Sequence, residues 1–170
     1  MEVDPLTGLE VARRGLYVHF PYCLRRCPYC DFTIAIAHSI PGARYADAVL
    51  AELRLRLAEW PAWAERPLDS VYLGGGTPSL WEAQEVGRVL EGIARALPVA
   101  ADAEISLEAN PEVADSARLA GYRAAGVNRL SLGIQSFESG VLATLGRSHS
   151  PSEAEAAFRT ARAATSSNST

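Results

Sequence analysis

The sequence contains no lysine, since all 16 basic residues of the 170-residue chain are arginine. The absence of lysine excludes Schiff-base catalysis and the phosphate-binding P-loop, which both depend on a lysine amine. An excess of positive charge is also missing, because the formal net charge is −4. Nucleic acids and anionic membranes both bind to positive surfaces, so we expect neither as a partner.

Long apolar runs are missing as well. No stretch reaches the roughly 18 apolar residues that a transmembrane helix needs, and the N-terminal segment has no apolar signal-peptide core. We therefore expect no transmembrane segment and a cytoplasmic location, where cysteines stay reduced. With 48% hydrophobic and 21% charged residues, the chain is long enough for one domain with a hydrophobic core.

The chain has only three cysteines, and all of them lie in the segment FPYCLRRCPYCDF. Cys23, Cys27 and Cys30 have the spacing C-x₃-C-x₂-C. A [4Fe–4S] cluster normally takes four cysteine thiolates, so a cluster held by three would leave one iron with an open coordination position. Such an iron can bind a substrate or a cofactor.

Two other interpretations of the cysteines remain open from the residues alone. A zinc site would need a fourth ligand, which Asp31, His19 or His38 could supply, although structural zinc sites usually combine two separated ligand pairs. A thiol–disulfide site would use the last two cysteines, whose C-x-x-C spacing resembles that of glutaredoxins. The second interpretation leaves the first cysteine without a role.

Apolar periodicity predicts an alternation of strands and helices. We expect strands over residues 15–20, 68–73, 104–108 and 128–134, and helices over residues 43–60, 79–97, 112–125 and 151–164. Ser79 is the expected N-cap of the second helix, and Gly126 follows the third helix as a C-cap glycine. Four strand–helix units predict parallel strands with right-handed crossovers, in an open α/β sheet or in part of a (β/α) barrel.

The domain organisation follows from the same pattern. We expect an N-terminal extension over residues 1–14, an α/β core over residues 15–164, and a polar tail over residues 165–170 that is disordered or out of frame. Four units do not close a barrel. We therefore expect the chain to be the N-terminal part of a larger protein, and a complete small domain with a disordered end is the alternative.

Polar or glycine-rich motifs follow the predicted strands. Gly74 to Pro78 form the sequence GGGTP, and consecutive glycines allow the backbone to approach a ligand and expose its N–H groups. Glu108 ends the third strand, where an unpaired carboxylate would be costly to bury. It is therefore a candidate site residue, with a salt bridge to a neighbouring arginine as the alternative. Because the carboxyl ends of parallel strands form the ligand-binding edge of such folds, we expect these motifs to meet there.

The cysteine spacing after the first strand resembles the motif of the radical S-adenosylmethionine (SAM) family. The segments LYVHFPYC, CPYCDF, YLGGGTPS, EANP, AGVNRLSLGIQSF and LGR are similar to one branch of that family, over about residues 15–164. This branch contains the oxygen-independent coproporphyrinogen III dehydrogenases (HemN) and the related heme chaperones (HemW). The resemblance implies an incomplete (β/α) radical SAM barrel with parallel strands.

The resemblance also implies cofactors and site residues. A [4Fe–4S] cluster on the three cysteines would bind the amino and carboxylate groups of SAM, and one electron would cleave SAM to methionine and a 5′-deoxyadenosyl radical. The SAM-contacting residues would be Tyr17, Tyr29, Gly75, Gly76, Thr77, Glu108, Gln135 and Arg147.

Two positions distinguish the members of this branch. The dehydrogenases have a fourth cysteine where this chain has Phe32, and they favour an aspartate where it has Asn110. The chain therefore resembles the heme chaperones more closely, which implies heme as a ligand and a heme acceptor protein as a partner. The alternative is a dehydrogenase that makes protoporphyrinogen IX.

The remaining histidines and loop arginines have simpler expected roles. We expect His19 to be a hydrogen-bonding structural residue rather than an axial heme ligand, and His38 and His149 to lie at the surface. Arg25 and Arg26 lie inside the cysteine segment. They form either a solvated loop tip or a docking site for an acidic electron donor such as a flavodoxin.

Overall fold

A parallel sheet of four strands forms the centre of the protein. The computed structural model describes residues 13–166, and the side chains of residues 13–164. The strands are β1 (Gly15–Phe20), β4 (Leu68–Gly75), β5 (Val99–Ala109) and β6 (Arg129–Leu132), and they lie side by side in this order. All neighbouring pairs are parallel. Each strand is therefore added next to the previous one, as in the wall of a (β/α) barrel, which confirms the predicted incomplete barrel.

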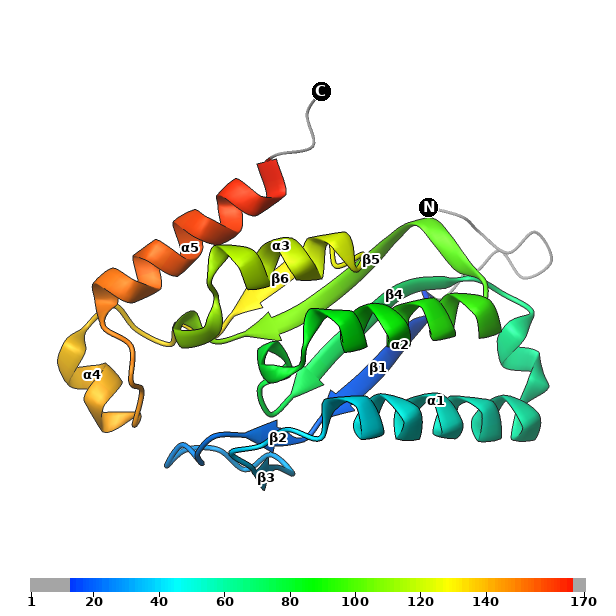
Figure 1. Ribbon diagram of the computed structural model, residues 1–170, viewed down its shortest axis with the longest axis horizontal. Coiled ribbons are helices and arrows are strands. Elements are labelled where there is room, and N and C mark those ends of the chain that lie inside the picture. The colour runs from blue at the N-terminus through cyan, green and yellow to red at the C-terminus, as the bar shows by residue number, and fades with distance from the viewer. Residues whose placement is uncertain (1–12, 167–170) are drawn as a thin grey trace.

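The helices follow the strands in alternation. They are α1 (Gly42–Glu59), α2 (Ala83–Ala96), α3 (Ser116–Ala124), α4 (Ser139–Thr144) and α5 (Pro151–Ser166), with short 3₁₀ helices at η1 (Pro61–Ala64), η2 (Pro78–Leu80) and η3 (Pro111–Val113). Figure 1 shows α1, α2 and α3 side by side on one face of the sheet, with α5 next to α3. Within residues 13–166, none of the helices is both long and apolar enough to cross a membrane.

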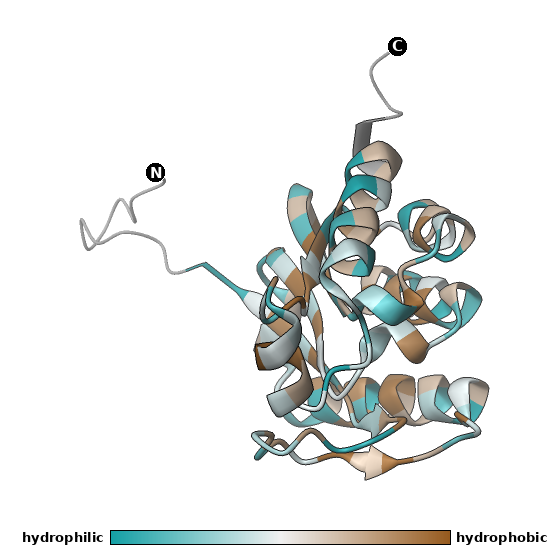
Figure 2. Ribbon diagram, turned by 90° about the vertical axis from the view of Figure 1, so that its left-hand side faces the viewer, coloured by the Kyte–Doolittle hydropathy of each residue, from teal (hydrophilic) through white to brown (hydrophobic). Residues whose placement is uncertain are grey.

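Alternation along the strands gives the sheet two different faces. Val18, Leu73 and Leu107 are buried on the helix-covered face, and burial of such side chains contributes about 25 cal/mol per Å² of apolar area. The opposite face bears Tyr17 and Tyr72, which are partners in the β1–β4 register. Figure 2 shows the resulting mixture of apolar and polar segments along the central strands.

An aromatic cluster fixes the end of β1 against the helices. Phe20 stacks on Trp81 with ring centroids 5.1 Å apart, and Tyr45 packs edge-on against both rings. The Tyr45 hydroxyl also donates a hydrogen bond to the carbonyl of His19. Since β1 leads directly into the cysteine segment, this cluster sets the starting position of that segment.

The structure corrects the predicted start of the second helix. Helix α2 begins at Ala83, and Ser79 lies in η2 with an exposed fraction of 1%. The Ser79 carbonyl accepts hydrogen bonds from the Tyr122 hydroxyl (2.8 Å) and the Arg118 guanidinium (3.0 Å). Ser79 therefore connects η2 to α3 in the interior and is not the N-cap of α2.

Other element boundaries also differ from the predictions. Strand β4 continues through Gly75, β5 already begins at Val99, and β6 ends at Leu132. The third helix begins at Ser116 because residues 111–113 form a 3₁₀ turn, and Asp115 caps it by accepting a hydrogen bond from the backbone N–H of Arg118 (2.8 Å). The last helix extends to Ser166, two residues beyond the predicted end. Most of the predicted extension and tail lies outside the described residues.

The predicted C-cap glycine of the third helix is confirmed. Gly126 has a φ of 108°, its N–H donates to the carbonyl of Arg123, and the N–H of Val127 donates to the carbonyl of Tyr122. This pair of bonds is the Schellman motif, which ends a helix with a residue of positive φ.

We expect Gly126→Ala to lower the free energy of unfolding by about 1–2 kcal/mol, because an L-residue is strained at this φ. Steric clash is not the cause, since an added Cβ would come no closer than 4.0 Å to Leu90. Gly140→Ala is the matched control: Gly140 lies in α4, and its Cβ would meet nothing within 4 Å. The control should be neutral or stabilising in urea unfolding. Equal losses in both variants would contradict the assignment of strain to position 126.

Candidate functional site

The cysteine segment is a loop closed at its base by a small parallel sheet. Strand β2 (Tyr22–Cys23) pairs with β3 (Ala35–Ile36), and the N–H of Ala37 donates to the carbonyl of Cys23 (3.0 Å). Cys30 N–H donates to the carbonyl of Cys27 (3.1 Å), which makes a tight turn between them. All three cysteines are free thiols, and Cys23 is buried. The loop lies at the carboxyl end of the sheet strands (Figure 1).

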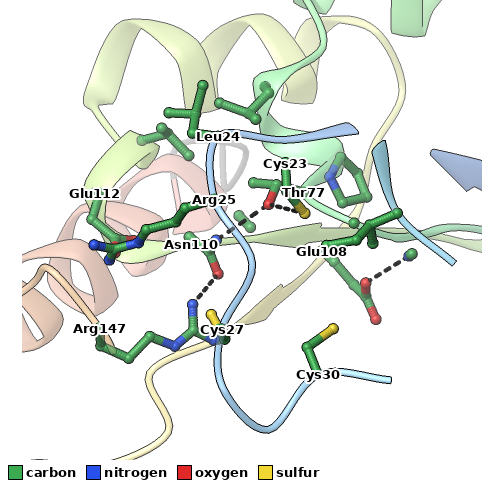
Figure 3. A pocket seen from close by; sticks show the side chains of 18 of the residues that line it. Cys23, Leu24, Arg25, Cys27, Cys30, Thr77, Glu108, Asn110, Glu112 and Arg147 are labelled. Atoms are coloured by element: carbon green, nitrogen blue, oxygen red, sulfur yellow. Dashed lines mark hydrogen bonds and ion pairs between the residues drawn. The ribbon is translucent and has the colours of Figure 1, made fainter. Parts of the chain in front are cut away.

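Nearly all predicted site residues line one cavity of about 370 Å³ at this end of the sheet. Figure 3 shows the cavity between the cysteine loop and the ends of the strands. The predicted residues in its lining are Cys23, Cys27, Tyr29, Cys30, Gly75, Gly76, Thr77, Glu108, Gln135 and Arg147. They come from four different strand–helix units, so the fold brings together motifs that are far apart in the sequence.

Tyr17 is the predicted site residue that the cavity lining does not include. It lies on the open face of the sheet with 54% of its surface exposed, stacks on Tyr72 at 6.1 Å, and shares a hydrogen bond of 2.9 Å with His19 Nδ1. Tyr72 in turn contacts Glu108. Tyr17 is thus connected to the cavity through one intervening tyrosine, and its contact with a ligand stays a prediction.

Gly75 at the end of β4 and Gly76 directly after it allow the backbone to approach the cysteine loop closely. A Cβ on Gly76 would lie 2.7 Å from the Tyr22 carbonyl oxygen and 3.0 Å from the Cys23 sulfur, and Gly75 has a φ of 118°. The sequence suggested exposed N–H groups here, but these groups already have partners. Gly75 N–H donates to Glu108, and Gly76 N–H donates to the carbonyl of Phe20. The glycines therefore allow close packing against Tyr22 and Cys23 and do not supply free hydrogen-bond donors.

Glu108 is held by hydrogen bonds at the end of β5. Its carboxylate accepts one from the Tyr72 hydroxyl (2.7 Å) and one from the N–H of Gly75 (3.0 Å). The partners found in the described structure are a phenol and a backbone amide, in place of the arginine considered as an alternative. Each carboxylate oxygen thus already accepts one hydrogen bond, and Glu108 forms part of the cavity lining.

A chain of side-chain hydrogen bonds crosses the cavity wall beside the cysteines. Arg147 donates to Asn110 Oδ1 (3.1 Å), Asn110 Nδ2 to Thr77 Oγ1 (3.5 Å), and Thr77 Oγ1 to Cys23 Sγ (3.5 Å). The dashed lines in Figure 3 follow this chain. In the sequence, Asn110 served only to separate two branches of a family, and its place directly after β5 is the signal that could have marked it as a site residue.

The pKa values of Cys23 and Tyr29 in the cavity lining are both raised. Burial raises the pKa of the Cys23 thiol, and the hydrogen bond from Thr77 partly offsets this rise. Partial burial also raises the pKa of the Tyr29 phenol, against the opposing effect of the nearby Arg147 guanidinium. Burial therefore opposes the thiolate form of Cys23, whereas the Thr77 hydroxyl and the Arg26 guanidinium favour it.

A second set of polar contacts surrounds Glu112, and it corrects the prediction that His149 lies at the surface. His149 is not a surface residue: it is 3% exposed, and its Nε2 lies 3.0 Å from the carbonyl oxygen of Ile134. Its Nδ1 lies 3.4 Å from Glu112, which also accepts from Ser148 and pairs with Arg25 at 3.8 Å. Burial raises the pKa of Glu112, but the hydrogen bonds from Ser148, its own backbone and His149 outweigh burial and lower it overall.

The segment after β6 is strained where it lines the cavity. Gln135 has a φ of 67°, which makes it the one non-glycine residue with positive φ among residues 13–166. The neighbouring Gly133 has no room for a side chain, since a Cβ would lie 2.8 Å from Asn110 Oδ1. Strain of this kind persists only where surrounding contacts enforce it, and it is common in ligand sites.

His19 behaves as predicted for a structural residue. Its Nδ1 contacts the Tyr17 hydroxyl at 2.9 Å, and its Nε2 contacts the carbonyl of Thr33 at the same distance. Both ring nitrogens are engaged, so neither is directed at a ligand. His38 is exposed, as expected.

The three cysteine thiols provide the donor atoms of the candidate site. A tetrahedral zinc with Zn–S bonds of about 2.3 Å draws its ligands close together. Among residues 13–166, no three His, Cys, Asp or Glu side chains are grouped closely enough to hold one metal ion. The three thiols line one cavity, and Cys23 packs directly against Gly76. This donor set fits an iron–sulfur cluster.

Comparisons with known proteins agree with this geometry. The heme chaperone HemW of Escherichia coli is 42% identical over 148 residues, which cover 86% of this chain and 38% of that protein. The mitochondrial radical S-adenosyl methionine domain-containing protein 1 of Bos taurus is 46% identical over 153 residues, which cover 89% of this chain and 33% of the relative. The chain thus spans about a third of the length of such relatives.

Solved structures show the same relationship. Coproporphyrinogen III oxidase (HemN) from Escherichia coli, described as a radical SAM enzyme, matches with a TM-score of 0.74 and 30% identity over 89% of this chain and 35% of that chain. Methylornithine synthase (PylB) matches with a TM-score of 0.58 at 16% identity, a likeness of fold alone, over 89% of this chain and 42% of that chain. The model of the radical SAM superfamily matches residues 17–170. The chain belongs to the radical SAM superfamily.

Proposed function

We propose that Cys23, Cys27 and Cys30 hold a [4Fe–4S] cluster and that SAM binds beside it in the cavity. The observation that supports this proposal is that all three thiols line the same cavity as the glycine-rich end of β4. When bound, the cluster supplies one electron for the reductive cleavage of SAM. The residues of the chain bind and orient the two groups.

The cavity offers complementary groups for SAM, which has a positively charged sulfonium and ammonium and a negatively charged carboxylate. Glu108 is a fixed acceptor for the cationic groups, because Tyr72 and Gly75 already orient its carboxylate. Arg147 is a donor for the anionic group, and its buried Nε has no hydrogen-bond partner. A buried donor without a partner is costly, so a ligand atom at this position would be stabilising. Gln135 and Tyr29 lie on the same lining.

Anaerobic reconstitution with iron and sulfide tests the cluster. We expect the parent protein to take up about four iron and four sulfide ions and to show broad visible absorption, and we expect Cys27→Ala to lose both. Asp31→Asn is the control, because Asp31 is an exposed neighbour of Cys30 and was a candidate zinc ligand. It should retain the cluster. Tight uptake of one zinc by the parent, lost in Asp31→Asn, would overturn the proposal.

We further propose that the whole protein is a heme chaperone of the HemW type that delivers heme to an acceptor protein in the cytoplasm. Support comes from the similarity to proteins named heme chaperone HemW and from Phe32 and Asn110, the positions at which the chain departs from the dehydrogenases. Residues 15–164 would form the N-terminal part of its radical SAM core. The second candidate is an oxygen-independent coproporphyrinogen III dehydrogenase, favoured by the structural match to HemN.

Parallel assays of the full-length protein separate these two functions. A heme chaperone should bind heme and transfer it to an apo-acceptor, without decarboxylating coproporphyrinogen III in the presence of SAM and a reductant. Decarboxylation coupled to SAM cleavage would instead establish the dehydrogenase. The Cys27→Ala variant adds a further distinction, because heme transfer that persists without the cluster would show a carrier whose cluster is structural or regulatory.

We also propose that the arginines of the cysteine loop help to dock an acidic electron donor such as a flavodoxin. Arg25 is half exposed although it contacts Glu112, and Arg26 donates to the carbonyl of Cys30 from an exposed position. Salt screens the attraction between exposed charges and shortens the distance over which they attract a partner. Cluster reduction should therefore slow with salt in the parent and depend less on salt in the Arg25→Ala, Arg26→Ala double variant. Salt-insensitive rates in both proteins would contradict this role.

A further inference from the structure

Asn110 occupies a position from which its side chain connects two parts of the site. Its amide lies between Arg147 and Thr77, and Thr77 contacts the sulfur of Cys23. Its backbone is held separately, since the N–H of Asn110 donates to Ser79 Oγ (3.3 Å). The side-chain amide therefore forms hydrogen bonds with Thr77 and Arg147 in the cavity wall and is not used to stabilise the turn after β5.

The chemistry of the partners gives this chain of hydrogen bonds a single direction. A guanidinium can only donate, so the amide oxygen of Asn110 must face Arg147. The amide NH₂ group then faces Thr77 and donates to Oγ1. Because the Thr77 oxygen accepts this bond, its own hydrogen is directed to its other neighbour, the Cys23 sulfur. Thr77 is 8% exposed, so bulk water has little access to compete for this hydrogen.

We propose that Asn110 is a positioning residue that directs the Thr77 hydroxyl hydrogen onto the Cys23 sulfur and thereby raises the reduction potential of the cluster. This inference rests on the proposed cluster. A hydrogen bond to a cysteine sulfur stabilises the reduced form, which carries more negative charge. The amide of Asn110 acts through Thr77 and does not itself contact the sulfur.

An aspartate at position 110 would reverse the direction of the bond to Thr77. It has the shape of asparagine, but as a carboxylate it can only accept, both from Arg147 and from the Thr77 hydroxyl. The Thr77 hydrogen would then point away from Cys23. Asn110→Asp therefore removes the bond to the sulfur while it preserves the packing of the site.

The test is a redox titration of the reconstituted protein, followed by electron paramagnetic resonance in the absence of SAM. Asn110→Asp should shift the reduction equilibrium about tenfold towards the oxidised cluster, which is about 59 mV for one electron. Thr77→Val, which removes the hydroxyl at nearly constant shape, should give a shift in the same direction. The double variant distinguishes the relay from the added negative charge, since in the Thr77→Val background Asn110→Asp should add clearly less than it does in the parent.

Two results would overturn the inference. An equal shift from Asn110→Asp in both backgrounds would assign the effect to charge alone, and an unchanged potential in Thr77→Val would show that Thr77 does not donate to Cys23. Circular dichroism and cluster content of each variant verify that the site is intact. If Asn110→Asp fails to fold, Thr77→Val together with Asn110→Ala still tests the two contacts. Failure of the parent to take up iron and sulfide would instead refute the cluster itself.

Discussion

The site depends on one steric constraint, the close approach of the end of β4 to the loop that follows β1. Atoms of Tyr22 and Cys23 lie where a side chain on Gly76 would have to be, and Gly75 adopts a φ that favours glycine. This approach allows the backbone of residues 76 and 77 to donate to carbonyls of Phe20 and Tyr22. It also brings the Thr77 hydroxyl to Cys23. The position of the Cys23 thiol therefore depends on the absence of side chains at the end of the neighbouring strand and just beyond it.

Local patterns were sufficient to predict the layers of the fold. The alternation in Leu16–Phe20 gives a strand with one apolar face, and polar motifs after each strand meet at one edge because parallel strands share a direction. The predictions that were wrong involve partners distant in the sequence. Ser79 has the sequence context of an N-cap, but it lies in the interior, where its carbonyl accepts hydrogen bonds from Tyr122 and Arg118. Similarly, His149 is buried because Glu112 and the Ile134 carbonyl flank its ring.

Position 110 illustrates what a residue identity can mean once the structure is known. As a letter in EANP it indicated only a likeness to the heme chaperones rather than to the dehydrogenases, which favour aspartate there. In the structure the same choice decides which atom of Thr77 faces Cys23, because an amide can donate and a carboxylate cannot. The residue identity at position 110 thus bears on the hydrogen bonding of Cys23 in this chain. Tyr17 shows the opposite case, in which a motif position lies one side chain away from the cavity.

The segment after β6 contributes no thiol, yet it contacts the cysteine loop through two sets of interactions. In the first, Arg147 is connected to Cys23 through Asn110 and Thr77. In the second, His149 binds the Ile134 carbonyl and lies next to Glu112, which pairs with Arg25 of the loop. Between the anchor points of these two connections lies Gln135, whose strained backbone is enforced by its neighbours. Because both sets of contacts begin in residues 134–149, a change in that segment would reach the cysteine loop at Cys23 and at Arg25, and the fourth strand–helix unit is as much a part of the cavity as the loop that bears the cysteines.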